Sequence, residues 1–246
     1  MIRVGVRGSD LALAYAKRAC DELPCETEIV VIKTMGDLNP DVPIHEMGGK
    51  GVFCSAIETA LINNEIDVAV HSLKDMPGDI QHPDLVVASY LKRNNPHDVL
   101  IGNVFEGCVI GTSSPRRREQ IQELYGDLNV EIKHIRGNID TRLQKLDDKE
   151  YDAIILAKAG LDALAISRIC KPLDIIPAVG QGTTVLQCRK DDVETIELVS
   201  KTNDDLTMRQ SFLERSLLKG MMGDCSTSVA AYAYGDSPIK MDVVYY

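Results

Sequence analysis

The sequence predicts an α/β fold with two lobes and a cleft between them. The first half alternates short apolar runs with amphipathic segments, and the same rhythm resumes after Asn94-Asn95-Pro96. The chain has 246 residues, enough for one or two hydrophobic cores. With 44% hydrophobic and 26% charged residues, the composition is typical of a globular protein.

The first lobe is predicted from strands that alternate with helices, a rhythm that favours a largely parallel sheet covered by helices. The expected strands are Ile2–Val6, Glu28–Ile32, Asp67–Val70 and Leu85–Ala88, and the expected helices are Leu11–Leu23 and Val52–Asn63.

The second lobe repeats this pattern, and Pro115 after Ser113-Ser114 is placed as the first residue of a helix. Its expected strands are Val99–Ile101, Cys108–Ile110, Val130–Ile132 and Ala153–Ala157, and its expected helices are Pro115–Tyr125, Asn138–Leu146 and Leu161–Ile169. The rest of the chain predicts an apolar strand at Thr184–Cys188, helices at Val193–Lys201 and Leu206–Lys219, and a strand pair in Ser226–Tyr246.

The composition argues against several classes of protein. Thirty-seven acidic against 27 basic residues give a net charge of −10, and Trp is absent, which disfavours nucleic-acid binding. The longest run without charge, Ile175–Cys188, is shorter than the ~20 residues of a membrane-spanning helix. Residues Met1–Arg7 show no apolar segment of a signal peptide. We expect a cytoplasmic protein with no membrane or nucleic-acid partner.

Neither a disulfide framework nor a metal site is expected. The seven cysteines are an odd number with no CxxC pair, and the five histidines lack the HExxH spacing of zinc enzymes.

The arginines are the first chemical signal. Five of the thirteen lie within the 27 residues that begin at Arg116 and end at Arg142. The first three follow Gly111-Thr112-Ser113-Ser114, a predicted strand-to-helix turn rich in donors, which favours a site for carboxylates or phosphates. The alternative is a solvated helix face with acidic partners one turn away.

Two other segments carry candidate groups. Asp75, in the segment His71–Pro77 after a predicted strand, is a candidate acid, base or cation stabiliser, with helix or turn capping as the alternative. Cys225 lies among Gly, Ser and Thr, where a thiol can be reactive or simply part of a loop. The Gly-rich segment Gly48-Gly49-Lys50-Gly51 lacks the spacing of a P-loop, and Gly180-Gln181-Gly182 lacks that of a dinucleotide site.

Eight short segments lie in order along almost the whole chain: Arg7-x-Ser9-x-Leu11-Ala12-Leu13, Gly48-Gly49-Lys50-Gly51-x-Phe53, His71-Ser72-Leu73-Lys74-Asp75-x-Pro77, Gly111-Thr112-Ser113-Ser114-x-Arg116-Arg117, Arg136-Gly137-Asn138-x-x-Thr141-Arg142-Leu143, Tyr151–Ala157, Pro177–Gly182 and Gly223-x-Cys225. Together they resemble the porphobilinogen deaminase (hydroxymethylbilane synthase) family. Each motif alone is weak, but eight in the right order are very specific.

The resemblance implies two α/β lobes like those of periplasmic binding proteins, with a central cleft, and a small, apparently shortened α+β C-terminal domain. Lobe 1 would comprise residues 1–92 with 184–203, lobe 2 residues 97–180, and the cofactor-attachment domain residues 206–246. A monomer is expected. The family condenses four porphobilinogen molecules head to tail with loss of ammonia and releases hydroxymethylbilane by hydrolysis, in tetrapyrrole biosynthesis.

The resemblance also assigns roles to individual residues. Asp75 matches the catalytic carboxylate, and Cys225 matches the cysteine that holds a dipyrromethane cofactor through a thioether, with no metal required. The residues that match cofactor contacts are Lys74, Ser113, Arg116, Arg117, Arg136 and Gly137; those that match substrate contacts are Arg7, Ser9, Arg142 and Arg168; those that match the mobile loop are Gly48, Gly49, Lys50 and Gly51.

The chain departs from the family pattern at several places. Ser55 stands where many relatives have Lys, Asp224 replaces a Gly before Cys225, and Gln187 replaces a common Glu. The chain ends at Tyr246, inside the expected third domain. Two alternatives remain open from the sequence: a non-catalytic two-lobed protein that binds a small polyanion, and an inactive relative.

Overall fold

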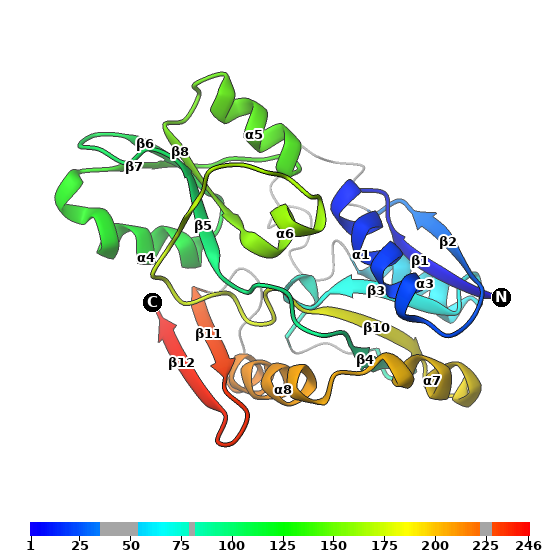
Figure 1. Ribbon diagram of the computed structural model, residues 1–246. Coiled ribbons are helices and arrows are strands. Elements are labelled where there is room, and N and C mark those ends of the chain that lie inside the picture. Colours follow the sequence, from blue (N-terminus) through cyan, green and yellow to red (C-terminus); the bar gives the residue numbers. More distant parts are fainter. Residues whose placement is uncertain (35–53, 79–81, 222–227) are drawn as a thin grey trace.

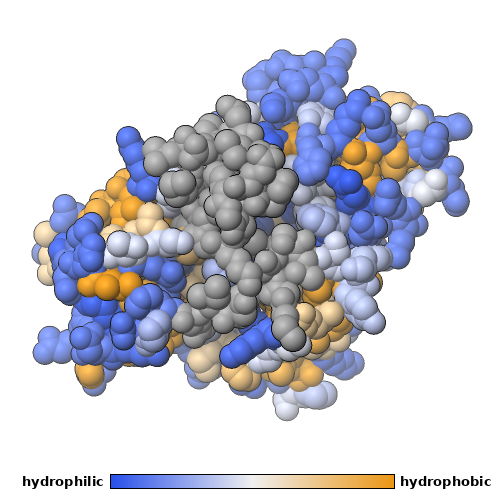
Figure 2. Space-filling view, turned by 180° about the vertical axis from the view of Figure 1, so that it is seen from behind, coloured by the Kyte–Doolittle hydropathy of each residue, from blue (hydrophilic) through white to orange (hydrophobic). Residues whose placement is uncertain are grey.

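The computed structural model describes residues 1–34, 54–78, 82–221 and 228–246. Within these residues the strands form two five-stranded sheets and one two-stranded sheet, with helices packed around them (Figure 1). The predicted α/β class, with a small α+β unit at the C-terminal end, is confirmed. Figure 2 shows the opposite face, where, among the described residues, polar side chains predominate and apolar ones form smaller patches. In the described ranges, no helix combines the length and apolar character needed to cross a bilayer.

The first sheet has the strand order β2-β1-β3-β10-β4. Its strands are β1 (Ile2–Arg7), β2 (Thr27–Ile32), β3 (Val68–Ser72), β4 (Leu85–Tyr90) and β10 (Thr184–Arg189). β1 is parallel to both its neighbours, but β10 is antiparallel to β3 and β4. Because β3 and β4 are both antiparallel to β10, they run in the same direction, and four of the five strands are aligned as expected for a largely parallel sheet. Strand β10 alone runs the opposite way, because it returns from the second lobe and not through a local helical crossover.

Helices α1, α3 and α7 accompany this sheet, with bounds Asp10–Glu22, Ser55–Ile62 and Val193–Val199. Helix α1 begins after Ser9, whose hydroxyl accepts a hydrogen bond of 3.3 Å from the amide of Ala12. Its buried face includes Ala16 and Ala19, which pack in one core cluster with Val4 and Val6 of β1. This packing fixes the loop between β1 and α1 against the sheet.

The second sheet has the strand order β7-β6-β8-β5-β9. Its strands are β5 (Asp98–Gly102), β6 (Val109–Gly111), β7 (Glu131–Lys133), β8 (Ala153–Ala157) and β9 (Lys171–Pro172), and its helices are α4 (Pro115–Tyr125), α5 (Ile139–Asp147) and α6 (Lys158–Ala163). It is mixed too, because β5 is antiparallel to β8 and β9. Pro115 is the first residue of α4, as predicted, and Ser114 caps this helix by accepting from the amide of Arg117.

The helix expected at Leu161–Ile169 is wrong in its bounds. Helix α6 starts earlier, at Lys158, and ends at Ala163. Ala165 adopts a positive φ of 52°, a left-handed conformation that a right-handed helix cannot contain.

The C-terminal unit consists of α8 (Asp205–Gly220) and the antiparallel pair β11 (Val229–Tyr234) and β12 (Lys240–Tyr245). Helix α8 packs along β11 (Figure 1). Leu218 of α8 shares an apolar cluster with Val229 and Ala231 of β11 and with Val179, which precedes β10. The unit therefore covers the chain segment that joins the two larger sheets.

Two segments cross between the large sheets, residues 91–97 and 173–183. They lie side by side, because the amide of Asn94 donates to the carbonyl of Gly182 at 2.9 Å and Nε of Arg93 donates to the carbonyl of Gln181 at 2.9 Å. Gly182 has a φ of +81°, and a Cβ at this position would lie 2.8 Å from the carbonyl oxygen of Asn94. The close approach of the crossings therefore requires glycine.

Glu214, on α8, ties the C-terminal unit to both crossings. Its carboxylate is fully buried and accepts from the amides of Gly180 (2.7 Å) and Ala233 (2.8 Å). It also forms a two-pronged ion pair with the guanidinium of Arg93, at 2.6 and 3.2 Å. One carboxylate thus satisfies donors from three separate segments.

We expect Glu214→Ala to lower the free energy of unfolding by about 3–5 kcal/mol, because it leaves the buried guanidinium of Arg93 without a counter-charge. Guanidinium chloride denaturation measures the change. The control, Glu22→Ala, removes a surface pair with Arg18 one helical turn away and should cost less than about 1 kcal/mol. A loss for Glu214→Ala as small as that of the control would contradict the assigned role.

Candidate active site

The segment after β3 forms a short, well-anchored turn. A 3-10 helix spans Leu73–Asp75, and the buried Leu73 donates its amide to the carbonyl of Thr183 at 2.9 Å. The guanidinium of Arg215, from α8, donates to the carbonyl of Pro77 at 2.6 Å and to that of Met76 at 3.4 Å. The backbone around Asp75 is thus held from two sides, by the returning crossing and by α8.

Two cavities meet at Asp75. The first, of about 60 Å³, lies between the β1–α1 loop and the end of β3. Its polar lining comes from Arg7, Ser9, Tyr15, His71, Ser72 and Asp75. The second, of about 180 Å³, lies where the crossing 173–183, α4 and α8 converge. Its polar lining comes from Lys74, Asp75, Ser114, Arg116, Arg117, Gln181 and Arg215. A carboxylate shared by two cavities, one of them rich in cations, is a candidate catalytic centre.

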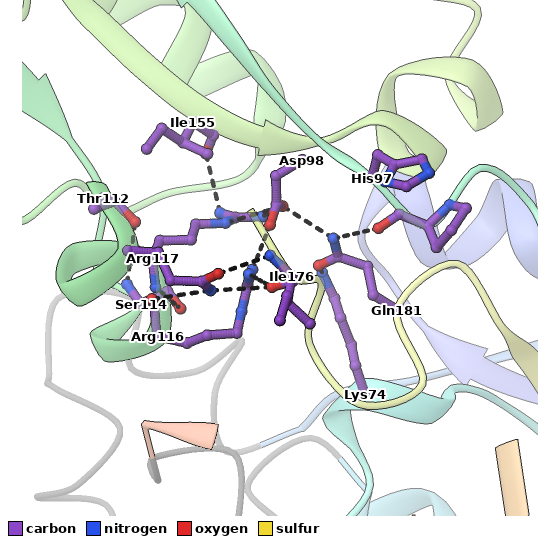
Figure 3. A network of polar contacts seen from close by, with 12 residues as sticks. Lys74, His97, Asp98, Thr112, Ser114, Arg116, Arg117, Ile155, Ile176 and Gln181 are labelled. Atoms are coloured by element: carbon purple, nitrogen blue, oxygen red, sulfur yellow. Dashed lines mark hydrogen bonds and ion pairs between the residues drawn. The ribbon is translucent and has the colours of Figure 1, made fainter. Parts of the chain in front are cut away.

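The cations of the second cavity are organised by Asp98, the first residue of β5 (Figure 3). Its carboxylate accepts from Arg116 Nη2 at 2.5 Å, from Arg117 Nη2 at 2.7 Å and from Gln181 Nε2 at 2.9 Å. Arg116 also donates to the carbonyl of Ile176 at 2.6 Å, and Arg117 to that of Ile155 at 3.0 Å. Both arginines are therefore held in fixed orientations at the start of α4.

The single carboxylate of Asp98 forms ion pairs with two guanidinium groups, those of Arg116 and Arg117. Burial alone would raise the pKa of Asp98, but the charges of Arg117 and Arg116 and their hydrogen bonds outweigh it and hold that pKa below its usual value. Burial lowers the pKa of Arg116, against the opposing charge of Asp98. Nε of Arg116 is buried and makes no hydrogen bond in the described ranges. The group therefore retains positive charge and a free donor at the edge of the cavity.

Lys74 extends from the β3 turn toward the same network (Figure 3). Its Nζ lies 3.5 Å from Oε1 of Gln181. Burial lowers the pKa of Lys74, the neighbouring Asp75 opposes this, and Arg117 adds to the lowering. Lys74 thus extends from the first sheet toward Arg116 and Arg117. With these two arginines it forms the cationic wall of the second cavity.

A further group of predicted residues lies near the start of α5. The hydroxyl of Ser113 donates to the carbonyl of Ile135 at 2.7 Å, and Nε of Arg142 donates to the carbonyl of Gly137 at 2.8 Å. Burial, together with the charges of Arg117 and Arg136, lowers the pKa of Arg142 to about 10. Arg142, Arg117 and Arg136 repel one another, so this region carries excess positive charge. An anionic ligand would stabilise it.

The structure brings some predicted residues together and leaves another apart. Arg7 and Ser9 line the first cavity, opposite Asp75. Arg168 lies elsewhere: it is exposed and pairs with Asp147 at the end of α5, and it lines neither cavity. Cys225 and the segment Gly48, Gly49, Lys50 and Gly51 lie outside the described residues.

Sequence reasoning missed Asp98, Gln181, Glu214 and Arg215. Asp98 follows the motif Asn94-Asn95-Pro96, which predicts only a connection between the two lobes. The sequence signal for Asp98 is a single acidic residue at the start of an apolar strand. Such a residue is expected to be buried and therefore to need a charged partner. Glu214 and Arg215 carry no such signal, because they lie in an ordinary charged stretch of helix.

We expect a tricarboxylate such as citrate to raise the thermal unfolding midpoint of the wild type, because it supplies negative charge to the cationic wall. At ten times its Kd the gain would be about 1.4 kcal/mol. Arg142→Gln should lose at least half of this gain relative to its own ligand-free midpoint. Arg209→Gln, which alters an exposed pair with Asp236, should keep it. Equal gains in both variants would show that citrate binds elsewhere.

Comparisons with known proteins agree with these features. The family model described as porphobilinogen deaminase, dipyrromethane cofactor binding domain, matches residues 2–197. The chain is 43% identical over 260 residues to the porphobilinogen deaminase of Bacillus velezensis, covering 99% of this chain and 82% of the relative. It is 44% identical over 261 residues to that of a Geobacillus species, with the same shares covered.

Among solved structures, a substrate binding domain of an amino acid ABC transporter from Streptococcus pneumoniae is 13% identical, with a TM-score of 0.48. That match covers 89% of this chain and 98% of the other. The family match and the sequence identities to the curated relatives decide the assignment: this chain belongs to the porphobilinogen deaminase family.

Proposed function

We propose that this chain joins four porphobilinogen molecules head to tail, releasing ammonia at each step and hydroxymethylbilane at the end, as a cytoplasmic, monomeric transferase. The observation that carries the proposal is the position of Asp75, at the junction of two cavities of which one has a cationic wall. Each porphobilinogen bears an acetate and a propionate, so a growing chain of pyrroles accumulates carboxylates that need such a wall.

The second cavity suits a dipyrromethane cofactor, whose side chains are also carboxylates. Lys74, Arg116 and Arg117 line it, and the buried Nε of Arg116 lacks an acceptor within the described ranges. We assign these residues, with Ser113, Arg136 and Gly137, to cofactor binding, and Cys225 to the covalent thioether. When bound, the cofactor supplies the electron-rich pyrrole carbon to which the first substrate unit is joined.

Asp75 acts on the substrate. Loss of ammonia from the aminomethyl group of porphobilinogen leaves an electron-poor pyrrole cation. The carboxylate of Asp75, facing the pyrrole N–H, stabilises that cation as it forms and holds the N–H proton in place. Arg7 and Ser9, across the first cavity, and Arg142 bind the substrate side chains. Arg168 stays a prediction as a substrate contact.

We expect Asp75→Ala to lower kcat at least about 100-fold, because no other carboxylate lines either cavity in the described part of the chain. Hydroxymethylbilane formation and ammonia release measure the effect, and the thermal midpoint should stay near that of the wild type. Asp84→Ala, at an exposed position, is the control. Near-normal turnover in Asp75→Ala would remove Asp75 from the mechanism.

Cys225→Ser should abolish covalent attachment of the cofactor. The intact mass of the denatured wild type should exceed that of the polypeptide by two linked pyrrole units, located on the Cys225 peptide, whereas Cys225→Ser should have the bare mass. Cys170→Ser, at a cysteine the structure shows as free, should keep the adduct. A wild type that stays bare and inactive after addition of porphobilinogen would instead support the non-catalytic or inactive alternative.

A further inference from the structure

A chain of three polar side chains runs from the surface helix α3 to the first cavity. Nε2 of Gln187 donates to Oε1 of Glu58 at 3.0 Å, and Oε1 of Gln187 lies 3.1 Å from Nε2 of His71. His71 and Gln187 are on the adjacent antiparallel strands β3 and β10, and both are almost completely buried. Glu58 projects from α3, which packs over these strands.

This row of hydrogen bonds determines which ring nitrogen of His71 carries the proton. Gln187 donates to Glu58 through its amide nitrogen, so its carbonyl oxygen is the atom that faces His71. A carbonyl oxygen only accepts hydrogen bonds, and Nε2 of His71 therefore carries the proton. Burial lowers the pKa of His71, although Glu58, Gln187 and Asp75 oppose this. A neutral ring with Nε2 protonated has an acceptor lone pair on Nδ1.

The acceptor Nδ1 is placed beside the candidate catalytic carboxylate. His71 lines the first cavity together with Asp75, and Nδ1 makes no hydrogen bond with any residue in the described ranges. The charged groups around the ring are Glu58 of α3, Asp75 after β3 and Arg7, the last residue of β1. The cavity therefore presents one neutral nitrogen acceptor next to the carboxylate that faces the pyrrole.

We infer that Nδ1 of His71 accepts a hydrogen bond from the aminomethyl nitrogen of porphobilinogen and so binds the leaving group; this rests on the proposed function. The substrate arrives with this nitrogen as an ammonium. Its C–N bond breaks, the electron pair leaves with nitrogen, and neutral ammonia departs while the positive charge stays on the pyrrole that Asp75 stabilises. His71 gains no proton in this step. It directs the leaving nitrogen away from the cationic second cavity.

Two substitutions at His71 separate this role from a structural one. Asn can place its carbonyl oxygen near the position of Nδ1, whereas Gln can place its amide nitrogen near the position of Nε2. His71→Gln thus keeps the bond to Gln187 and loses the acceptor in the cavity, and His71→Asn does the reverse. We expect the kcat for ammonia release from porphobilinogen to be about ten- to a hundredfold lower in His71→Gln than in His71→Asn. We also expect His71→Asn to have the lower thermal midpoint.

A purely structural histidine predicts the opposite order of kcat, and that result would overturn the inference. A second readout does not depend on activity: 15N NMR of the histidines in the wild-type holoenzyme should show His71 neutral with the proton on Nε2. A proton on Nδ1 would overturn the inference even if neither variant folds. A wild type that releases no ammonia would overturn the proposed function and this inference with it, whereas an active wild type with the reversed order of variants overturns only the role of His71.

Discussion

The cleft depends on the buried carboxylate of Asp98. It orients Arg116 and Arg117 at the start of α4 and also binds Gln181 of the returning crossing. Charges this deeply buried would be very costly without mutual pairing and full hydrogen bonding. Because Asp98 begins β5 directly after the first crossing, the same contact places the cationic wall relative to both crossings. The contacts of Asp98 therefore fix both the orientation of the two arginines and the position of the returning crossing.

The network around Asp98 contains more positive than negative groups, which explains why an acidic protein has a basic cleft. Asp98 neutralises one of the two arginines it binds, and Lys74 and Arg142 add further positive charge, each with a pKa lowered first by burial and then by neighbouring arginines. The net charge of −10 resides elsewhere on the chain, where acidic residues face solvent or pair locally, as Asp147 does with Arg168. A polycarboxylate is therefore attracted to the cleft even though the net charge of the whole chain is negative.

Much of the fold and part of the site could be predicted because the relevant signals are local in sequence. Pro115 after Ser114 marks the start of α4, and the polar segment around Asp75 marks the end of a strand. The partners of buried charges are not local: Asp98 meets Arg117, 19 residues away, and Glu214 meets Arg93, 121 residues away. The direction of β10 has no local signal for the same reason, since only the tertiary path of the chain determines it. Helix α6 shows the limit of periodicity, because the left-handed Ala165 has no signature in an apolar pattern.

In the function proposed above, the two cavities that meet at Asp75 hold different groups of the reactants. Fixed cations in the second cavity, and Arg7 in the first, would bind carboxylates whose charge does not change during the reaction. At His71 the leaving nitrogen would change from an ammonium to neutral ammonia, so a second carboxylate there would stabilise the reactant more than the transition state. A neutral acceptor avoids this, because it binds the departing nitrogen without holding it as an ion pair. Within this proposal Gln187 separates His71 from Glu58, because its amide nitrogen donates to the carboxylate while its carbonyl oxygen faces the ring.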